Sequence, residues 1–87
     1  MSDPARIEFP CDYPIHVIGE RQASFQEDVL HIVRRHAPAL DESSVTLRES
    51  REGSYCSLRV TIVATGSAQL EALHAELIAH AAVRMVL

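Results

Sequence analysis

The chain has 87 residues and a formal net charge of −4, and all eight of its basic residues are arginine. A chain of this length forms one domain around one core, and its negative charge argues against a general nucleic-acid binder. It has neither the roughly 20-residue apolar run of a bilayer span nor a secretory signal at Met1-Ser2-Asp3-Pro4, so we expect a cytoplasmic protein with no membrane or nucleic-acid partner.

The chain begins with a predicted arm and a first strand. Residues 1–12 contain two prolines and mixed polarity, which predicts an N-terminal arm that Ile7 and Phe9 could dock on the body. Residues 13–19 predict a strand, in which Pro14 is tolerated only at the beginning because it donates no ladder hydrogen bond. Alternation gives the strand two faces, one with Ile15 and Val17 and the other with His16 and Ile18.

The first helix is predicted from Ser24 to about His36. Ser24 and Glu27 have the spacing of a capping box, in which each side chain bonds the backbone N–H of the other residue. Pro38 ends the helix, since the residue before a proline is pushed out of the helical region. Helical spacing gives the buried stripe, which consists of Phe25, Val29, Ile32, Val33 and His36.

A hairpin is predicted in the middle of the chain. Residues 45–50 predict a second strand with Val45 and Leu47 on one face, and residues 51–54 predict a turn in which Gly53 supplies the positive φ. The strand that returns, residues 55–64, alternates over its whole length. Its apolar face carries Cys56, Leu58, Val60, Ile62 and Ala64, and its other face Tyr55, Ser57, Arg59, Thr61 and Val63.

A second helix and a final strand complete the prediction. Residues 65–67 offer N-cap candidates for a helix that runs to about His80. Its buried stripe is predicted as Leu70, Leu73, Leu77 and Ala81. The last strand, residues 83–87, is predicted to place Val83, Met85 and Leu87 on one face, and Arg84 and Val86 on the other.

The order strand, helix, strand, strand, helix, strand predicts the architecture. Two crossovers that each hold one helix are right-handed, and two helices can cover the apolar faces of four strands. We therefore predict a ferredoxin-like α+β sandwich over residues 13–87, with two helices on one face of a four-stranded antiparallel sheet.

Four segments resemble the YbeD family of small bacterial proteins: Glu8-Phe9-Pro10, Arg35-His36-Ala37-Pro38, Gly53-x-Tyr55-x-Ser57 and Val83-Arg84-Met85-Val86-Leu87. The resemblance covers nearly the whole chain. It implies a ferredoxin-like fold related in architecture to ACT regulatory domains, and a bacterial cytosolic setting. It implies no catalytic residue, and the family label "lipoate regulatory protein" points to no site in this chain.

The residues indicate no catalytic, cofactor or metal site. Cys56 and Ser57 lie in mid-strand without a predicted histidine–acid pair beside them. The helical histidines stand five and six positions apart, which stacks no two imidazoles on one face, and no Cys-x-x-Cys motif closes a zinc site. Cys11 and Cys56 are therefore expected to be reduced thiols.

Two surfaces remain as candidate binding sites. The first is an effector or anion site at Gly19, Arg21 and Ser24, where a helix N-terminus offers free N–H groups. The resemblance supports it, because ACT domains bind small effectors near the first strand–helix loop, while the alternative is an ordinary capped helix.

The second candidate is the open face of the sheet. It carries three arginines from three strands beside a tyrosine, an arrangement suited to carboxylates: Arg48, Tyr55, Arg59 and Arg84. The alternative is a solvated face balanced by acids such as Glu49. An RNA-binding sheet would show two or three stacking aromatics, whereas this face offers only Tyr55. We therefore expect a non-enzymatic regulatory or adaptor protein that binds a protein partner here, or that pairs with itself through the second and last strands, which are edges; the alternative is a sensor of a small anionic metabolite.

Overall fold

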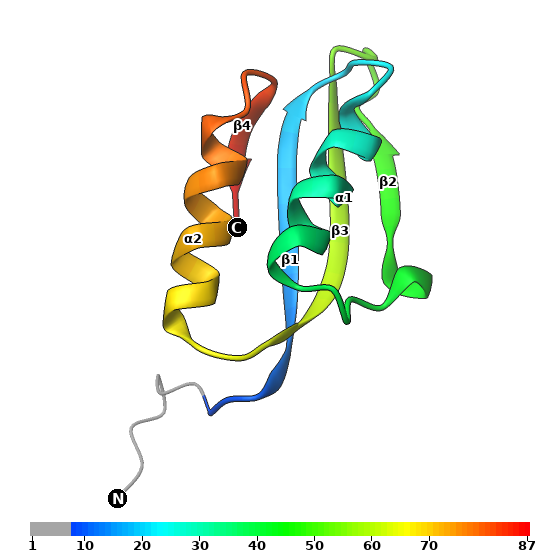
Figure 1. Ribbon diagram of the computed structural model, residues 1–87. Helices are drawn as coiled ribbons and strands as arrows, with labels where there is room; N and C mark the ends of the chain where they lie inside the picture. Colours follow the sequence, from blue (N-terminus) through cyan, green and yellow to red (C-terminus); the bar gives the residue numbers. More distant parts are fainter. Residues whose placement is uncertain (1–7) are drawn as a thin grey trace, which may run out of the picture.

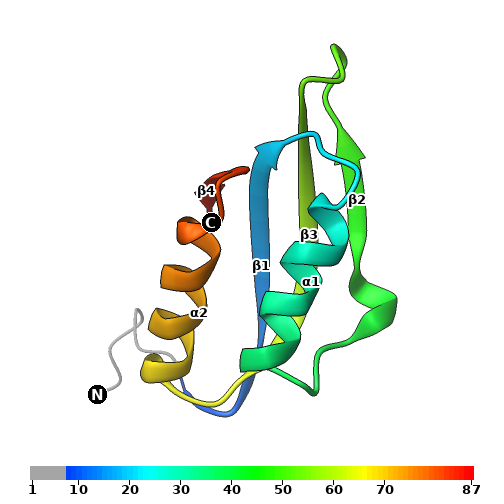
Figure 2. The ribbon, with the colours of Figure 1, turned by 45° about the horizontal axis from the view of Figure 1, so that its top comes forward.

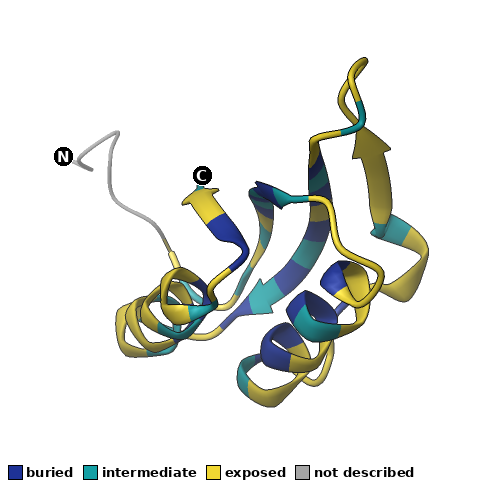
Figure 3. Cartoon of the chain, turned by 90° about the horizontal axis from the view of Figure 1, so that it is seen from above, coloured by how far each residue is buried: buried dark blue, intermediate teal, exposed yellow. Residues whose placement is uncertain are grey.

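The protein is described here by a computed structural model, which covers residues 8–87 (Figure 1). Along the chain the elements are β1 (Cys11–Glu20), α1 (Phe25–His36), the 3-10 turn η1 (Glu42–Ser44), β2 (Thr46–Glu49), β3 (Tyr55–Ala64), α2 (Ser67–Ala79) and β4 (Val83–Val86). The sheet is antiparallel with strand order β2-β3-β1-β4. Both helices lie on one side of it, and no described element covers the other side (Figure 3). The predicted ferredoxin-like sandwich is confirmed.

The β1–β3 pair forms the centre of the fold. The two strands are in register over ten residues each, from Cys11 opposite Ala64 to Glu20 opposite Tyr55. As predicted, the alternating apolar face points toward the helices. The residues that are least exposed there and on the helices are Val17, Phe25, Val29, Val33, Leu58, Val60, Ile62, Leu73 and Leu77.

β1 begins two residues earlier than predicted, at Cys11, so Pro14 lies inside the strand rather than at its start. Pro14 is tolerated because of the side its nitrogen faces. The backbone of His16 bonds to Leu87 in both directions, N to O at 3.0 Å and O to N at 2.8 Å. Alternation turns the nitrogen of Pro14 to the same side, beyond the end of β4. Of the predicted arm, Phe9 is half-buried and residues 1–7, including Ile7, lie outside the described residues.

The predicted stripe of α1 is confirmed for its four apolar members, and His36 is partly buried. The predicted capping box is wrong. Ser24 has φ −97° and ψ 5°, and its side chain makes no capping bond. Its hydroxyl instead donates to Asp28 Oδ2 at 3.1 Å. A capping side chain needs extended backbone at the N-cap to reach the amides of the first turn, and Ser24 does not have it.

The prediction for the last strand is wrong after Val83. Ile18 lies opposite Met85 while Gly19 lies opposite Val83, so one residue of β4, Arg84, is extra. Such a bulge reverses the alternation beyond it. Val86 therefore packs against the core, and Met85 moves to the open face of the sheet.

The helical layer is joined by a polar seam. His36 Nε2 lies 2.8 Å from Glu76 Oε1, and Arg35 Nη1 lies 2.7 Å from the other oxygen of Glu76. At the opposite end His80 Nε2 lies 3.0 Å from Asp28 Oδ2. The two helices therefore run antiparallel, side by side over the sheet (Figure 2).

The stripe of α2 is confirmed at Leu73 and Leu77, and Leu70 is half-buried. The prediction is wrong at Ala81, which is exposed. The helix ends at Ala79, so Ala81 lies in the following turn, and Ala82 is buried in its place.

Candidate functional site

The open face of the sheet brings together side chains from all four strands. The register places Thr46, Arg59 and His16 in one row across β2, β3 and β1, and the backbone bonds add Leu87 beside His16. The next row consists of Arg48, Ser57, Ile18 and Met85. Arg48, Tyr55 and Arg59, three of the four predicted partner-binding residues, thus lie on this face, and Tyr55 is 49% exposed.

The three predicted arginines differ in their charge environment. Arg84 Nη2 lies 2.8 Å from Glu20 Oε1, and this hydrogen bond raises the pKa of the Arg84 guanidinium. Arg84 lies in the bulge of β4. Because Glu20 neutralises its charge, Arg84 contributes little free positive charge to the face. Arg48 and Arg59 are exposed and form no ion pair with any residue in 8–87. The predicted balancing acid, Glu49, pairs with Arg21 instead, at 3.2 Å.

Two shallow hollows indent the face, and each contains one of the unpaired arginines. The first measures about 370 Å³ and includes Arg48, Ser50, Tyr55 and Ser57 among its lining residues. The second measures about 390 Å³ and its lining residues include Ser44, Thr46, Arg59 and Thr61. Both sets combine a guanidinium with hydroxyl groups that can donate to anionic oxygens; the Ser44 hydroxyl is the exception, because it already donates to the Asp41 carbonyl oxygen at 2.6 Å.

His16 lines both hollows. Its Nε2 atom is buried and has no hydrogen-bond partner within residues 8–87. A buried nitrogen without a partner is uncommon, because the group loses its bond to water. The alternation of β1 predicted the position of His16, but no sequence pattern marks its unpaired nitrogen.

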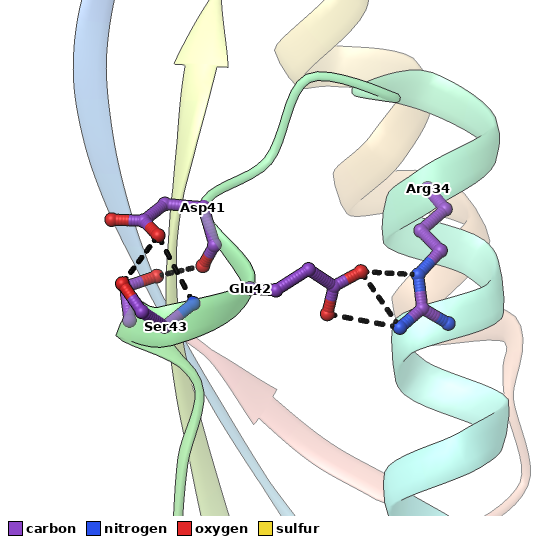
Figure 4. A network of polar contacts seen from close by, with 5 residues as sticks. Arg34, Asp41, Glu42 and Ser43 are labelled. Carbon is purple, nitrogen blue, oxygen red and sulfur yellow. Dashed lines mark hydrogen bonds and ion pairs between the residues drawn. The ribbon is translucent and has the colours of Figure 1, made fainter.

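The second hollow is held in shape by a network around η1 (Figure 4). The Asp41 side chain accepts from the Ser43 backbone N–H at 3.0 Å and from the Ser43 hydroxyl. Arg34 donates from Nε and Nη2 to the two carboxylate oxygens of Glu42, at 2.9 and 3.0 Å. This pairing lowers the pKa of the Glu42 carboxyl. The network fixes η1 to α1, and Ser44 then accepts from the backbone N–H of Thr61 at 2.9 Å.

The predicted effector site is not brought together as one group. Gly19 is buried, and a Cβ there would lie 2.4 Å from the Ala82 carbonyl oxygen and 2.5 Å from Phe25 Cε1. Ser24 directs its hydroxyl to Asp28. Only Arg21 lines the nearby hollow of about 500 Å³, together with Gln22, Phe25, Gln26, Leu47, Glu49, Gly53 and Cys56.

Two side chains capable of acid–base or nucleophilic chemistry, His80 and Cys56, are held in structural surroundings. His80 Nδ1 accepts from the Ala82 N–H at 3.1 Å, so its Nε2 carries the proton given to Asp28. Burial raises the pKa of the Cys56 thiol, and Glu49 adds to the increase, which disfavours the thiolate. Within residues 8–87 no three His, Cys, Asp or Glu side chains gather as a metal site would require.

No helix in this part of the chain is long and apolar enough to cross a bilayer.

Solved structures with a similar fold include two small bacterial proteins. The ACT domain from GTP pyrophosphokinase of Chlorobium tepidum superposes with a TM-score of 0.71 at 13% identity, over 90% of this chain and 96% of that one. The solution structure of protein HP0495 from Helicobacter pylori gives 0.72 at 14% identity, over 99% and 90%. At these identities the likeness shows the fold alone.

Sequence comparison shows the family. The UPF0250 protein of Hahella chejuensis is 51% identical over 87 residues, which covers all of this chain and 96% of that protein. The UPF0250 protein of Nitrosomonas europaea is 42% identical and covered completely. The family model described as "Protein of unknown function (DUF493)" matches residues 4–87. The predicted resemblance to the YbeD proteins is thereby confirmed, and the chain belongs to this DUF493 family of small bacterial proteins.

Proposed function

We propose that this protein is a non-enzymatic regulatory or adaptor protein of the bacterial cytoplasm, which acts by binding another protein through the open face of its sheet. The observation that carries the proposal is the pair of unpaired, exposed arginines, Arg48 and Arg59, each beside its own hollow on a face that no described element covers.

The composition of the face supports protein binding. Arginine and tyrosine are enriched where protein interfaces concentrate their binding energy. In addition to Tyr55, the face exposes two apolar residues, Met85 and Leu87, with exposed fractions of 48% and 65%. Apolar surface of this kind gains free energy when a partner removes it from water, and the arginine forks supply orientation.

The first test is capture of partners from a lysate of the source organism. The wild-type chain, Arg59→Glu and Arg51→Glu are immobilised side by side, and the bound proteins are identified by mass spectrometry. Arg51 lies in the turn between β2 and β3, so its substitution makes the same charge change away from the face. A protein retained by wild type and Arg51→Glu but lost by Arg59→Glu supports the proposal; equal retention by all three variants contradicts it.

A second candidate function is a sensor of a small anionic metabolite. The hollow of about 500 Å³ beside α1 favours it, because Arg21 lines that hollow at the N-terminal end of the helix, where backbone N–H groups attract anions. A ligand held there raises the melting temperature by mass action. A screen of amino acids, acyl compounds and nucleotides that produces no such increase would count against the sensor.

Self-association through the edge strands β2 and β4 is a separate possibility within the adaptor proposal. Both are short, at four residues each, and their outer backbone groups are unpaired within the described sheet. Sedimentation velocity at several concentrations measures the oligomeric state directly.

A further inference from the structure

We propose that the partner of the open face is an acidic segment of another protein, with two carboxylates that enter the two arginine hollows and an apolar side chain that packs on the β1–β4 side. This inference rests on the proposed function and specifies the chemistry of the partner.

Charge is the first argument for an acidic partner. The open-face positions of β1, β2 and β3 hold two carboxylates, Asp12 and Glu20, and Glu20 is already paired with Arg84. Glu49 also lines the first hollow, but its carboxylate is paired with Arg21. Arg48 and Arg59 have no anionic partner within residues 8–87. The whole chain nevertheless carries a net charge of −4. The face is therefore a local cationic region on an acidic protein, which binds carboxylates by direct contact rather than by long-range attraction.

The arrangement of donors is the second argument. Each hollow adds hydroxyl donors to its arginine: Ser50, Tyr55 and Ser57 in the first, Thr46 and Thr61 in the second. Between them His16 Nε2 is buried without a partner. A guanidinium binds a carboxylate through two parallel N–H groups, and the hydroxyls can complete the shell around it. The two hollows, of about 370 and 390 Å³, offer one guanidinium each, so two carboxylates can be bound at once.

The apolar border is the third argument. Ile18, Met85 and Leu87 lie on β1 and at the β4 edge of the same face. The two unpaired arginines lie on β2 and β3, whereas the β1–β4 side carries these three apolar side chains beside the Glu20–Arg84 ion pair. A segment with acidic residues on one side and an apolar residue on the other satisfies both sides of the face.

Other occupants match the face less well. A second copy offers two arginines to a face on which, among residues 8–87, Asp12 is the one open-face carboxylate outside an ion pair, so like charges would meet. Nucleic acid supplies phosphates, but the face has a single exposed aromatic residue, Tyr55, on which a base could stack.

The test is a selection of random displayed dodecapeptides on the immobilised full chain. Parallel selections use Arg48→Glu/Arg59→Glu and the control Arg51→Glu. Peptides from the wild-type selection are then synthesised with a fluorescent label and titrated against each variant and against Arg59→Lys. Thermal unfolding checks that every variant remains folded, with a melting temperature within about 5 °C of wild type.

The expected result is enrichment of peptides with two acidic residues and an aliphatic or aromatic residue. The single substitutions Arg48→Glu and Arg59→Glu, titrated in the same way, should each weaken their binding by about tenfold or more, as for other hydrogen bonds to charged groups. Arg51→Glu should leave binding unchanged, and Arg59→Lys should fall between the two because lysine keeps the charge but not the fork. The doubly reversed chain should select basic peptides instead.

Three outcomes overturn the inference. Enriched peptides without acidic residues, or no enrichment at all, would show that the face does not recognise carboxylates. A concentration-dependent dimer that Arg48→Glu/Arg59→Glu abolishes would assign the face to a second copy. Binding of a labelled single-stranded RNA that the same substitutions abolish would assign it to phosphates. If the selected peptides are not acidic but bind more weakly to Arg48→Glu/Arg59→Glu than to wild type, the acidic partner is refuted while the proposed function stands. If the selected peptides bind every variant of the face as tightly as wild type, both are refuted.

Discussion

Substitution of Gly19 by alanine tests whether this glycine serves packing or ligand approach. The added Cβ would lie 2.4 Å from the Ala82 carbonyl oxygen and 2.5 Å from Phe25 Cε1. That oxygen accepts from the backbone N–H of Glu20 at 2.8 Å, so it cannot retreat without losing a β1–β4 bond. Phe25 is 1% exposed and has little space in which to move.

The size of the effect follows from three contributions. Overpacking of a filled core costs about 1–3 kcal/mol, and the strained backbone bond adds about 1 kcal/mol. The lower entropy of the unfolded alanine chain returns about 0.4–1 kcal/mol. The free energy of unfolding should therefore fall by about 1–3.5 kcal/mol, which lowers the melting temperature by about 5–25 °C in a domain of this size.

Urea unfolding followed by circular dichroism measures the change. Gly66→Ala is the matched control, because Gly66 is the N-cap of α2 with φ 170° and has nothing within 4 Å of an added Cβ. At Gly66 alanine is a poorer N-cap than glycine, which lowers the free energy of unfolding by about 0.5–1 kcal/mol. Alanine also lowers the entropy of the unfolded chain, which raises the free energy of unfolding by about the same amount, so the two effects nearly cancel. If Gly19→Ala were as stable as Gly66→Ala, the packing argument would be refuted and ligand approach would regain its place as the reason for glycine at this position.

Three further predictions concern the core, the helical seam and the open edge of β1. Leu58→Ala should cost about 2–5 kcal/mol and Thr61→Ala much less, because Leu58 is 0% exposed; equal costs in urea would contradict the assigned faces of β3. A hydrogen bond from His36, assisted by the charge of Arg35, lowers the pKa of Glu76 below 4.5. The ionised Glu76 carboxylate therefore stabilises the fold fully at pH values above its pKa in the unfolded chain, and this stabilisation is lost as the pH falls through its pKa in the folded protein. Glu76→Gln should flatten the loss of stability that urea midpoints record as the pH falls below the ordinary glutamate pKa, and an unchanged acid limb would show that the pair does not contribute. Pro14→Val should expose a new N–H beyond the end of β4 and promote association, which light scattering detects; a monomer at all concentrations would show that proline does not protect this edge.

The sequence predicted those features that depend on local periodicity. The alternation of residues 55–64 assigned both faces of β3, and the α1 stripe followed from helical spacing. The same alternation predicted Arg59 on the open face, because one face of a strand is fixed once the residues of its other face are buried. The alternation of residues 45–50 predicted Arg48 there, and its register opposite Ser57 places it on that face although no residue of β2 is buried.

The failures lie where tertiary contacts override a local pattern. A bulge in β4 cannot be read from Val83–Leu87, since it depends on how β1 and β4 meet around Gly19. The capping-box pattern at Ser24 was present, but the backbone conformation there leaves the hydroxyl to Asp28. The partner of Arg84, Glu20, lies on another strand. No one-dimensional pattern indicates which of several arginines remains unpaired.

The distribution of ion pairs also separates the two sides of the fold. Four of the six ion pairs within residues 8–87 involve α1: Arg34–Glu42, Arg35–Glu76, His36–Glu76 and Asp28–His80. They join α1 to α2 or to the loop before β2, so polar side chains on that side serve the structure. On the open side Arg48 and Arg59 stabilise no described contact. A side chain that contributes nothing to folding can be reversed in charge with little loss of stability. Binding and stability can therefore be measured separately on this face, whereas on the helical face the same substitutions would change both together.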